Sequence, residues 1–381
     1  MLLVENVTVV SPPQVLPNRD VWIAGSLISA ITPHGQRKGT PARRLNGRGR
    51  FLSPGWLELQ LNGGFGKDFT EEPASIWEVA ARLPEMGITA FLPTVITAPA
   101  AVAEQARAVL AQGAPAGWRG AVPLGLHIEG PFLNPKRKGA HPPAYLRPPD
   151  PAWVRNWSPE GQVRLVTLAP ELPGALDLVR ALRRQGVVVS MGHTEATLAE
   201  AEVGFKAGIT YGTHLFNAMR GLHHREPGAV GALLAHPEIA VGMIVDGIHV
   251  HPAAVALAWR CKTPETVTLV TDACAGLGMP QGRYRLGAME IVVQEDRATL
   301  PDGTLAGSIL RPAVALRNLM EFTGCTVAEA VTTLTAAPAR VLGLPRPRVA
   351  VGEPANLTLF ALDGTVAATI IGGQVVWENA G

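Results

Sequence analysis

The stretch from Val187 to Asn217 most constrains the fold of this chain, because it holds two short apolar runs that each end on a histidine. The first run, V-V-V-S-M-G-H, ends on His193, and the second, I-T-Y-G-T-H, ends on His214. Apolar side chains recur at helical spacing over residues 195–207 between them. The pattern predicts a strand, a helix and a second, parallel strand, whose ends are neighbours. Two imidazoles at such ends favour metal ligands over two unrelated core histidines.

Composition narrows the class of protein. Of 381 residues, 47% are hydrophobic, which is enough for one large core or two domains. The net charge of +2 gives no electrostatic case for nucleic acid or an anionic membrane as a partner. Three separated cysteines argue against a disulfide framework and against a thiolate zinc site. Because the N-terminus lacks a basic region and apolar runs stay well below about 20 residues, we expect a cytoplasmic protein without a membrane span.

From residue 53 onward, apolar strands alternate with helical segments. Eight strands are predicted at residues 57–61, 88–95, 122–129, 163–169, 187–192, 209–215, 240–245 and 267–271. Helices are predicted at residues 74–86, 100–112, 174–185, 195–207, 311–322 and 327–336. This order is typical of an α/β fold, a (β/α)8 TIM-like barrel, although an open doubly wound sheet has a similar order.

The two ends of the chain have a different pattern. Residues 1–52 and 347–381 contain short apolar runs separated by turn residues, which predicts one small β-sandwich domain formed by both termini. The barrel is then expected over residues 53–346. Near 283–305, alternating residues and a Pro-Asp-Gly turn predict β-hairpins inserted after the eighth strand.

Charged and imidazole side chains follow several of the predicted strands: Glu129, His193, His214, His249 and Asp272. In a barrel these side chains converge on one mouth. One Glu with two His is a standard three-ligand set for catalytic zinc, and other divalent metals, iron included, accept the same ligands. The Asp that closes the set suits a general base for a metal-activated water. The remaining His could polarise a carbonyl or stabilise an oxyanion.

Several motifs carry a family resemblance. The chain resembles the amidohydrolase superfamily and, more narrowly, the N-acetylglucosamine-6-phosphate deacetylases, in order and over essentially its whole length. The resemblance to the superfamily rests on S-P-G-W at residues 53–56. The narrower resemblance rests on L-Q-L-N-G at 59–63, L-H-I-E-G-P-F at 126–132, G-H-T at 192–194, T-H-L-F-N-A-M at 213–219 and V-T-D-A at 270–273.

The resemblance implies a hydrolase that removes acetate from the acetamido group of an amino-sugar 6-phosphate. It implies that Glu129, His193 and His214 bind the metal, that Asp272 is the acid/base and that His249 contacts the substrate. The other substrate-binding residues that it implies are Ala140, His141, Asn217, Ala218, Arg225, Leu305, Ala306 and Gly307. It also implies a homodimer, in which Arg225 completes the phosphate site of the neighbouring subunit.

Gln60 and Asn62 stand at the end of the first predicted strand, where many members of the superfamily have His-x-His and a second metal. Neutral amides are poor ligands for zinc compared with imidazole. We therefore expect one divalent metal ion per subunit, zinc in the first place and iron as the alternative. The two amides are expected to hydrogen-bond in the pocket.

Two other functions are alternatives to this deacetylase activity. The same chemistry could act on a different N-acylated amine or on a cyclic amide, but such a neutral substrate gives no reason for Arg225 and His141 as a phosphate clamp. A non-catalytic barrel that serves as a scaffold should have lost a metal ligand or Asp272, and this chain retains all four residues.

Overall fold

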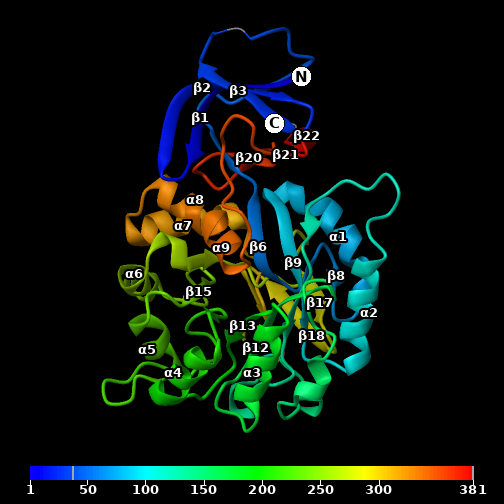
Figure 1. Ribbon diagram of the computed structural model, residues 1–381, viewed down its shortest axis with the longest axis vertical. Helices are drawn as coiled ribbons and strands as arrows, with labels where there is room; N and C mark the ends of the chain where they lie inside the picture. The colour runs from blue at the N-terminus through cyan, green and yellow to red at the C-terminus, as the bar shows by residue number, and fades with distance from the viewer. Residues whose placement is uncertain (37, 380–381) are drawn as a thin grey trace.

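The computed structural model describes residues 1–36 and 38–379. A barrel of strands surrounded by helices forms the larger part of the molecule, and a small β domain lies at one end of the long axis (Figure 1). The predicted fold, a (β/α)8 barrel with a small β-rich domain at the termini, is confirmed by the strand pairing described below.

The barrel consists of parallel strands in chain order. They are β6 (Trp56–Leu61), β9 (Ile88–Ile96), β11 (Leu126–Glu129), β12 (Val163–Leu168), β13 (Val188–Met191), β14 (Tyr211–Gly212), β15 (Ala240–Met243) and β16 (Val267–Leu269). A parallel bridge between Leu61 and Ala273 and a hydrogen bond from Asp272 N to Gln60 O (2.9 Å) join the last strand to the first. This seam closes the ring, so all eight strand ends face one mouth.

Most of the predicted strands are shorter in the structure than the sequence pattern indicates, and two of them markedly so. The sixth was predicted over 209–215, but β14 covers only Tyr211–Gly212, because the backbone turns sharply at His214 (φ 32°). The third was predicted from residue 122, but Val122–Pro123 forms the separate short strand β10 and β11 begins at Leu126. Both differences leave the histidine and glutamate at the mouth.

The helices cover the outside of the barrel. They are α1 (Ile76–Arg82), α2 (Ala100–Ala111), α3 (Ala175–Arg184), α4 (Leu198–Ala207), α5 (Gly228–Ala235), α6 (Pro252–Cys261), α7 (Pro312–Thr323), α8 (Val327–Leu334) and α9 (Ala336–Val341). Short 3-10 turns lie at Pro73–Ser75, Leu83–Met86, Pro135–Arg137, Pro143–Tyr145, Pro151–Val154 and Pro264–Thr266. The sequence pattern missed α5, α6 and, apart from Ala336, α9.

The helix α4 shows how local sequence fixes the crossover between the two histidine strands. The Thr197 hydroxyl accepts a hydrogen bond from Glu200 N, and the Glu200 carboxylate accepts one from Thr197 N. This capping box satisfies orphan N–H groups at the start of the helix. Gly208 (φ 127°) ends the helix in a conformation that disfavours residues with a Cβ.

The small domain is one eight-stranded sheet built from both ends of the chain. Its order is β22-β21-β20-β5-β1-β2-β3, with β4 beside β1. The strands are β1 (Leu2–Ser11), β2 (Gln14–Ala24), β3 (Leu27–Pro33), β4 (Arg43–Asn46), β5 (Phe51–Pro54), β20 (Leu357–Phe360), β21 (Val366–Ile371) and β22 (Gln374–Glu378). The sheet has its own apolar core, in which side chains from β1 pack against side chains from β20 and β21.

A separate three-stranded sheet follows the barrel's last strand. It consists of β17 (Gly282–Leu286), β18 (Met289–Gln294) and β19 (Arg297–Thr299). Its buried side chains, Leu286, Ile291 and Val293 among them, pack with Ile96 and Cys274 of the barrel. A two-stranded pair, β7 (Gly63–Gly64) and β8 (Lys67–Asp68), lies nearby. The inserted sheet therefore stands on the barrel mouth.

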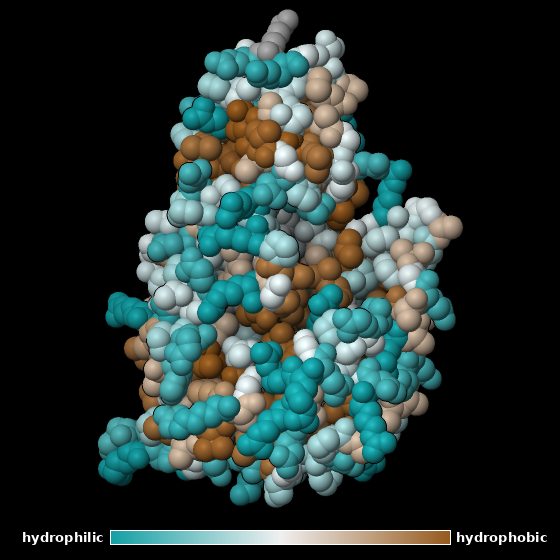
Figure 2. Space-filling model, viewed as in Figure 1, coloured by the Kyte–Doolittle hydropathy of each residue, from teal (hydrophilic) through white to brown (hydrophobic). Residues whose placement is uncertain are grey.

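The face of the molecule drawn in Figure 2 is mostly hydrophilic. Figure 2 shows hydrophilic side chains over much of the barrel, with hydrophobic ones in separate patches on the small domain and near the middle of this face. Among the described residues, the helices are all too short or too polar to cross a bilayer.

Candidate metal-dependent active site

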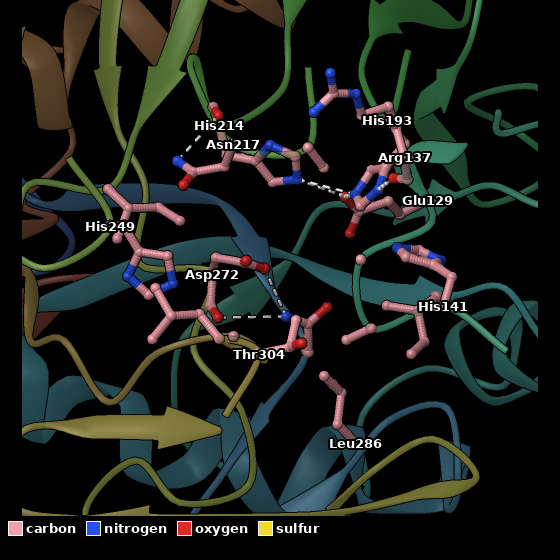
Figure 3. A pocket seen from close by; sticks show the side chains of 18 of the residues that line it. Glu129, Arg137, His141, His193, His214, Asn217, His249, Asp272, Leu286 and Thr304 are labelled. Atoms are coloured by element: carbon pink, nitrogen blue, oxygen red, sulfur yellow. Dashed lines mark hydrogen bonds and ion pairs between the residues drawn. The ribbon is translucent and has the colours of Figure 1, made fainter. Parts of the chain in front are cut away.

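Three side chains at the barrel mouth are aimed by unusual backbone conformations. His193 (φ 50°), His214 (φ 32°) and Asp272 (φ 49°) each follow the end of a strand with a positive φ. This region is sparsely populated by residues with a Cβ, and such strain is found most often at functional sites. The turn at each residue directs the side chain toward the barrel axis, where Glu129 ends β11. Figure 3 shows the four side chains around one cavity.

Glu129, His193 and His214 form a compact buried cluster. Glu129 Oε1 lies 3.1 Å from Nε2 of each histidine, and the two Nε2 atoms are 3.1 Å apart. Arg137 O accepts a hydrogen bond from His193 Nδ1 (2.8 Å), so Nε2 is the nitrogen that keeps a lone pair in the neutral ring. Ligand atoms of a tetrahedral zinc site with bonds of about 2.1 Å lie about 3.4 Å apart, close to these distances. The cluster therefore fits one divalent metal ion.

The charges of the cluster are mutually dependent. Burial by itself would raise the pKa of Glu129, but hydrogen bonds and charges from His193 and His214 outweigh burial and hold that pKa well below its usual range. Glu129 is therefore an anion that can face a cation.

Asp272 lies across the cavity from the cluster. Its Oδ1 accepts hydrogen bonds from Gln60 Nε2 (3.1 Å) and Asn62 Nδ2 (2.7 Å). Gln60 Nε2 also lies 3.2 and 3.3 Å from the two oxygens of Glu129, so one amide links the two carboxylates. Burial, and then the charge of Glu129, raise the pKa of Asp272 to about 6, against the opposing effects of His214, Asn62 and His249. Both amides use their N–H groups as donors to carboxylates.

His249 and His141 face the cavity from opposite sides (Figure 3). Asp246 Oδ2 accepts a hydrogen bond from His249 Nδ1 (2.6 Å) and so fixes the ring. Thr97 N donates to His141 Nδ1 (3.3 Å), which places the proton of the neutral ring on Nε2. Burial, and then the charge of His193, lower the pKa of His141 to about 3, so this ring is neutral.

The cavity has a volume of about 360 Å³, within the size range of small-ligand pockets. Most of the predicted site residues line it: Asn62, Glu129, Ala140, His141, His193, His214, Asn217, Ala218, His249, Asp272, Leu305 and Gly307. Lys136 and Arg137 add positive charge to the wall. Arg137 also forms an ion pair with Glu195, and the carboxylates of Glu129 and Asp272 line the same cavity, so groups of both charges face its interior.

Three predicted residues do not line the cavity. Ala306 is buried in the core of the inserted sheet. Gln60 contributes through its hydrogen bonds to Glu129 and Asp272. Arg225 lies on an exposed loop, where its Nη1 is 2.8 Å from His224 Nε2.

The sequence prediction missed several participants, and three of them are informative. Asp246 orients His249, and the Asp-x-x-His spacing in D-G-I-H could have indicated this pair. Leu286 and Thr304 line the cavity from the inserted sheet and its following turn. No local pattern distinguishes these two from other residues of the hairpins.

The comparisons with known proteins agree with this geometry. The sequence model described as the Amidohydrolase family matches residues 76–376. The chain belongs to the amidohydrolase family. Within that family, it is 38% identical to the N-acetylglucosamine-6-phosphate deacetylase of Mus musculus, over 95% of this chain and 92% of that protein. It is 35% identical to the deacetylase of the same name from Bacillus subtilis (strain 168), over 99% and 97%.

A solved structure extends the match. A mutant of N-acetyl-D-glucosamine-6-phosphate deacetylase from Mycobacterium smegmatis, in complex with N-acetyl-D-glucosamine-6-phosphate, has 34% sequence identity and a TM-score of 0.90, covering 98% of this chain and 99% of that one. The predicted resemblance to the deacetylases of the amidohydrolase family is therefore confirmed.

One buried carboxyl near the cavity is ionisable but has no part in the proposed metal cluster. Asp68 Oδ1 accepts hydrogen bonds from Thr70 N (3.0 Å), Glu71 N (2.8 Å) and Gly287 N (3.1 Å). The last bond ties the turn beside Leu286 to the barrel. Burial raises the pKa of Asp68 to about 6, even though the three backbone N–H groups lower it.

This pKa predicts a pH-dependent stability. Because the folded-state pKa of Asp68 lies above that of an unfolded Asp, near 3.9, its contribution is complete below about pH 4 and is lost as pH rises through about 6. Relative to Asp68→Asn, the wild-type free energy of unfolding should fall by about 2 kcal/mol between pH 4 and pH 7. Urea unfolding of both proteins across this range measures the difference. A difference that does not change with pH would contradict the prediction.

Proposed function

We propose that this chain hydrolyses the acetamido group of N-acetylglucosamine 6-phosphate to glucosamine 6-phosphate and acetate. The observation that carries the proposal is the buried Glu129–His193–His214 cluster, which faces Asp272 across a small-ligand cavity. The matched relatives bear the name of this activity, and the M. smegmatis structure holds this sugar phosphate.

We propose that the cluster holds one divalent metal ion per subunit, zinc in the first place and iron as the alternative. Bound there, such an ion lowers the pKa of a water molecule toward neutrality and polarises the amide carbonyl. Gln60 and Asn62 support a single ion, because they stand where a second site would need imidazoles. Their N–H groups donate to carboxylate oxygens instead.

Asp272 is proposed to move the proton. Its Oδ1 is held by Gln60 and Asn62, so we assign the transfer to the other oxygen, Oδ2. Oδ2 takes a proton from the attacking water while the water oxygen bonds to the acetyl carbonyl carbon. The C–N bond then breaks, the proton passes from Oδ2 to the leaving amine nitrogen, and the acetic acid that forms releases the second proton of the water to solvent and leaves as acetate.

The histidines outside the cluster are proposed to bind substrate oxygens. The Asp246 carboxylate orients His249, so Nε2 is the ring nitrogen that we propose contacts the substrate near the reacting amide. His141 is neutral with its proton on Nε2, so it can donate to a sugar hydroxyl.

The sugar phosphate is proposed to lie along the rest of the cavity wall, with Asn217, Ala218 and Ala140 near the sugar and Leu305 and Gly307 opposite. Lys136 and Arg137 support an anionic group there. A homodimer is proposed, in which Arg225 of a second copy reaches the phosphate; its exposed position and planar donor fork support this role. A cytoplasmic location stays a prediction.

Acetate release tests the substrate. We expect the purified enzyme, with metal content measured on the same preparation, to release acetate from N-acetylglucosamine 6-phosphate at least about 100-fold faster, in kcat/KM, than from N-acetylglucosamine, since charge-assisted bonds to phosphate contribute about 3 kcal/mol or more. About one metal ion per subunit is expected. Equal rates on the two sugars would contradict the proposal that the cavity binds the phosphate group. Release from a different N-acylated amine alone would favour the alternative amidohydrolase activity.

A further inference from the structure

Glu171, in the loop after β12, touches neither the cavity nor the metal cluster, yet three hydrogen bonds converge on its carboxylate. All three donors belong to residues that hold His193 in place. We infer that Glu171 is a positioning residue for His193, which sets the direction of this ligand and so the affinity for the metal. The inference rests on the metal site of the proposed function.

Two of the donors directly follow His193 in the chain. Glu171 Oε2 accepts from the Thr194 hydroxyl (2.5 Å), and Glu171 Oε1 accepts from Glu195 N (2.7 Å). Thr194 is fully buried, and its backbone N donates to Ala218 O (3.1 Å) on the loop that carries Asn217. The carboxylate therefore anchors the peptide on the C-terminal side of the ligand.

The third donor comes from the other side of His193. Asn134 Nδ2 donates to Glu171 Oε1 (2.9 Å), and Asn134 N donates to His193 O (3.0 Å). Three residues further on, Arg137 O accepts the bond from His193 Nδ1 (2.8 Å), and Figure 3 shows Arg137 beside the ring. Glu171 thus ties the loop that contacts the imidazole to the loop that bears it.

The strained backbone of His193 requires such a restraint. A φ of 50° costs free energy for a residue with a Cβ and persists only where the surroundings enforce it. An ionised carboxylate offers acceptor sites for all three donors and no competing N–H. Glutamine keeps one acceptor oxygen, whereas alanine leaves Asn134, Thr194 and Glu195 without this partner.

The affinity of the protein for Zn²⁺ tests the inference. Zn²⁺ dissociation constants are obtained by competition with a chelator for the wild type, Glu171→Gln and Glu171→Ala. We expect the alanine variant to bind Zn²⁺ about 10- to 100-fold more weakly, as for other residues that orient metal ligands, with the glutamine variant in between. At saturating Zn²⁺, KM should stay within about 2-fold of wild type. Asp177→Ala, which removes an exposed carboxylate on α3, is the control and should bind as wild type.

The outcomes separate the two proposals. Unchanged Zn²⁺ affinity in both variants, with a wild type that binds the metal and releases acetate, would overturn the role of Glu171 and leave the proposed function standing. A wild type that binds no metal would overturn the metal site itself, and this inference with it. If the alanine variant does not fold, the glutamine variant decides: an affinity equal to that of the wild type sinks the inference, and a several-fold loss supports it.

Discussion

Asp272→Asn should lower kcat for acetate release by about 10²- to 10⁴-fold, the usual range for loss of a general acid–base group. Asparagine keeps the size of the side chain and its Oδ1 acceptor, so the bonds from Gln60 and Asn62 can persist. What it loses is the oxygen that we assign to proton transfer. The metal content should stay near one ion per subunit, because Asp272 is not part of the three-ligand cluster.

Steady-state kinetics and elemental analysis on one preparation check this result. The control is Asp296→Asn, a side chain that is 65% exposed in the inserted sheet, and it should keep wild-type kcat. A variant at Asp272 that retains metal and more than a tenth of wild-type kcat would rule out this residue as the proton carrier. Loss of metal together with kcat would instead mean that Asp272 helps to hold the ion.

Glu129→Gln should release the metal and lower kcat by about 10³-fold or more, since loss of a bound ion removes several kcal/mol of transition-state stabilisation. Glutamine has the same shape, but its amide is neutral, and its N–H₂ can face His193 and His214 as a donor. The anionic oxygen that lies 3.1 Å from both Nε2 atoms is then gone.

Metal content per subunit after dialysis is the direct measurement, followed by kcat with and without added Zn²⁺. Glu104→Gln changes an exposed glutamate of α2 that forms an ion pair with its helix neighbour Arg107, and it should leave both quantities unchanged. Full metal occupancy in Glu129→Gln would exclude this carboxylate as a ligand and with it the proposed cluster.

The strands and their polar ends were predictable because each is encoded in a short stretch of chain. An apolar run ending on Glu129 or His193 needs no distant information, and strand order in a barrel then brings such ends together. Among the missed helices, α5 and α6 lack such local signals. Residues 228–235, G-A-V-G-A-L-L-A, have no polar face, so periodicity cannot distinguish a helix from a strand there. Long-range packing decides that case.

Contacts between loops could not be predicted from the sequence, for a different reason. Asp246 and Glu171 act through hydrogen bonds whose partners depend on how the loops are folded. The positive φ of Asp272 lies at the closing seam, where Asp272 N donates to Gln60 O on the first strand of the barrel, and this contact between distant segments has no local sequence signal. Roles in substrate binding, Arg225 above all, came from the family resemblance and not from spacing.

The shared sheet of the two termini has a consequence for biosynthesis. β5 pairs with β20, so Pro54 meets Leu357 across nearly the whole length of the chain. Because β5 precedes the barrel in the chain and β20 follows it, the edge of β5 that pairs with β20 stays open while the barrel is being synthesised. Such an edge is a template for pairing with other chains. By pairing with β5, the strands β20, β21 and β22 therefore cover an edge that would otherwise be open to other chains.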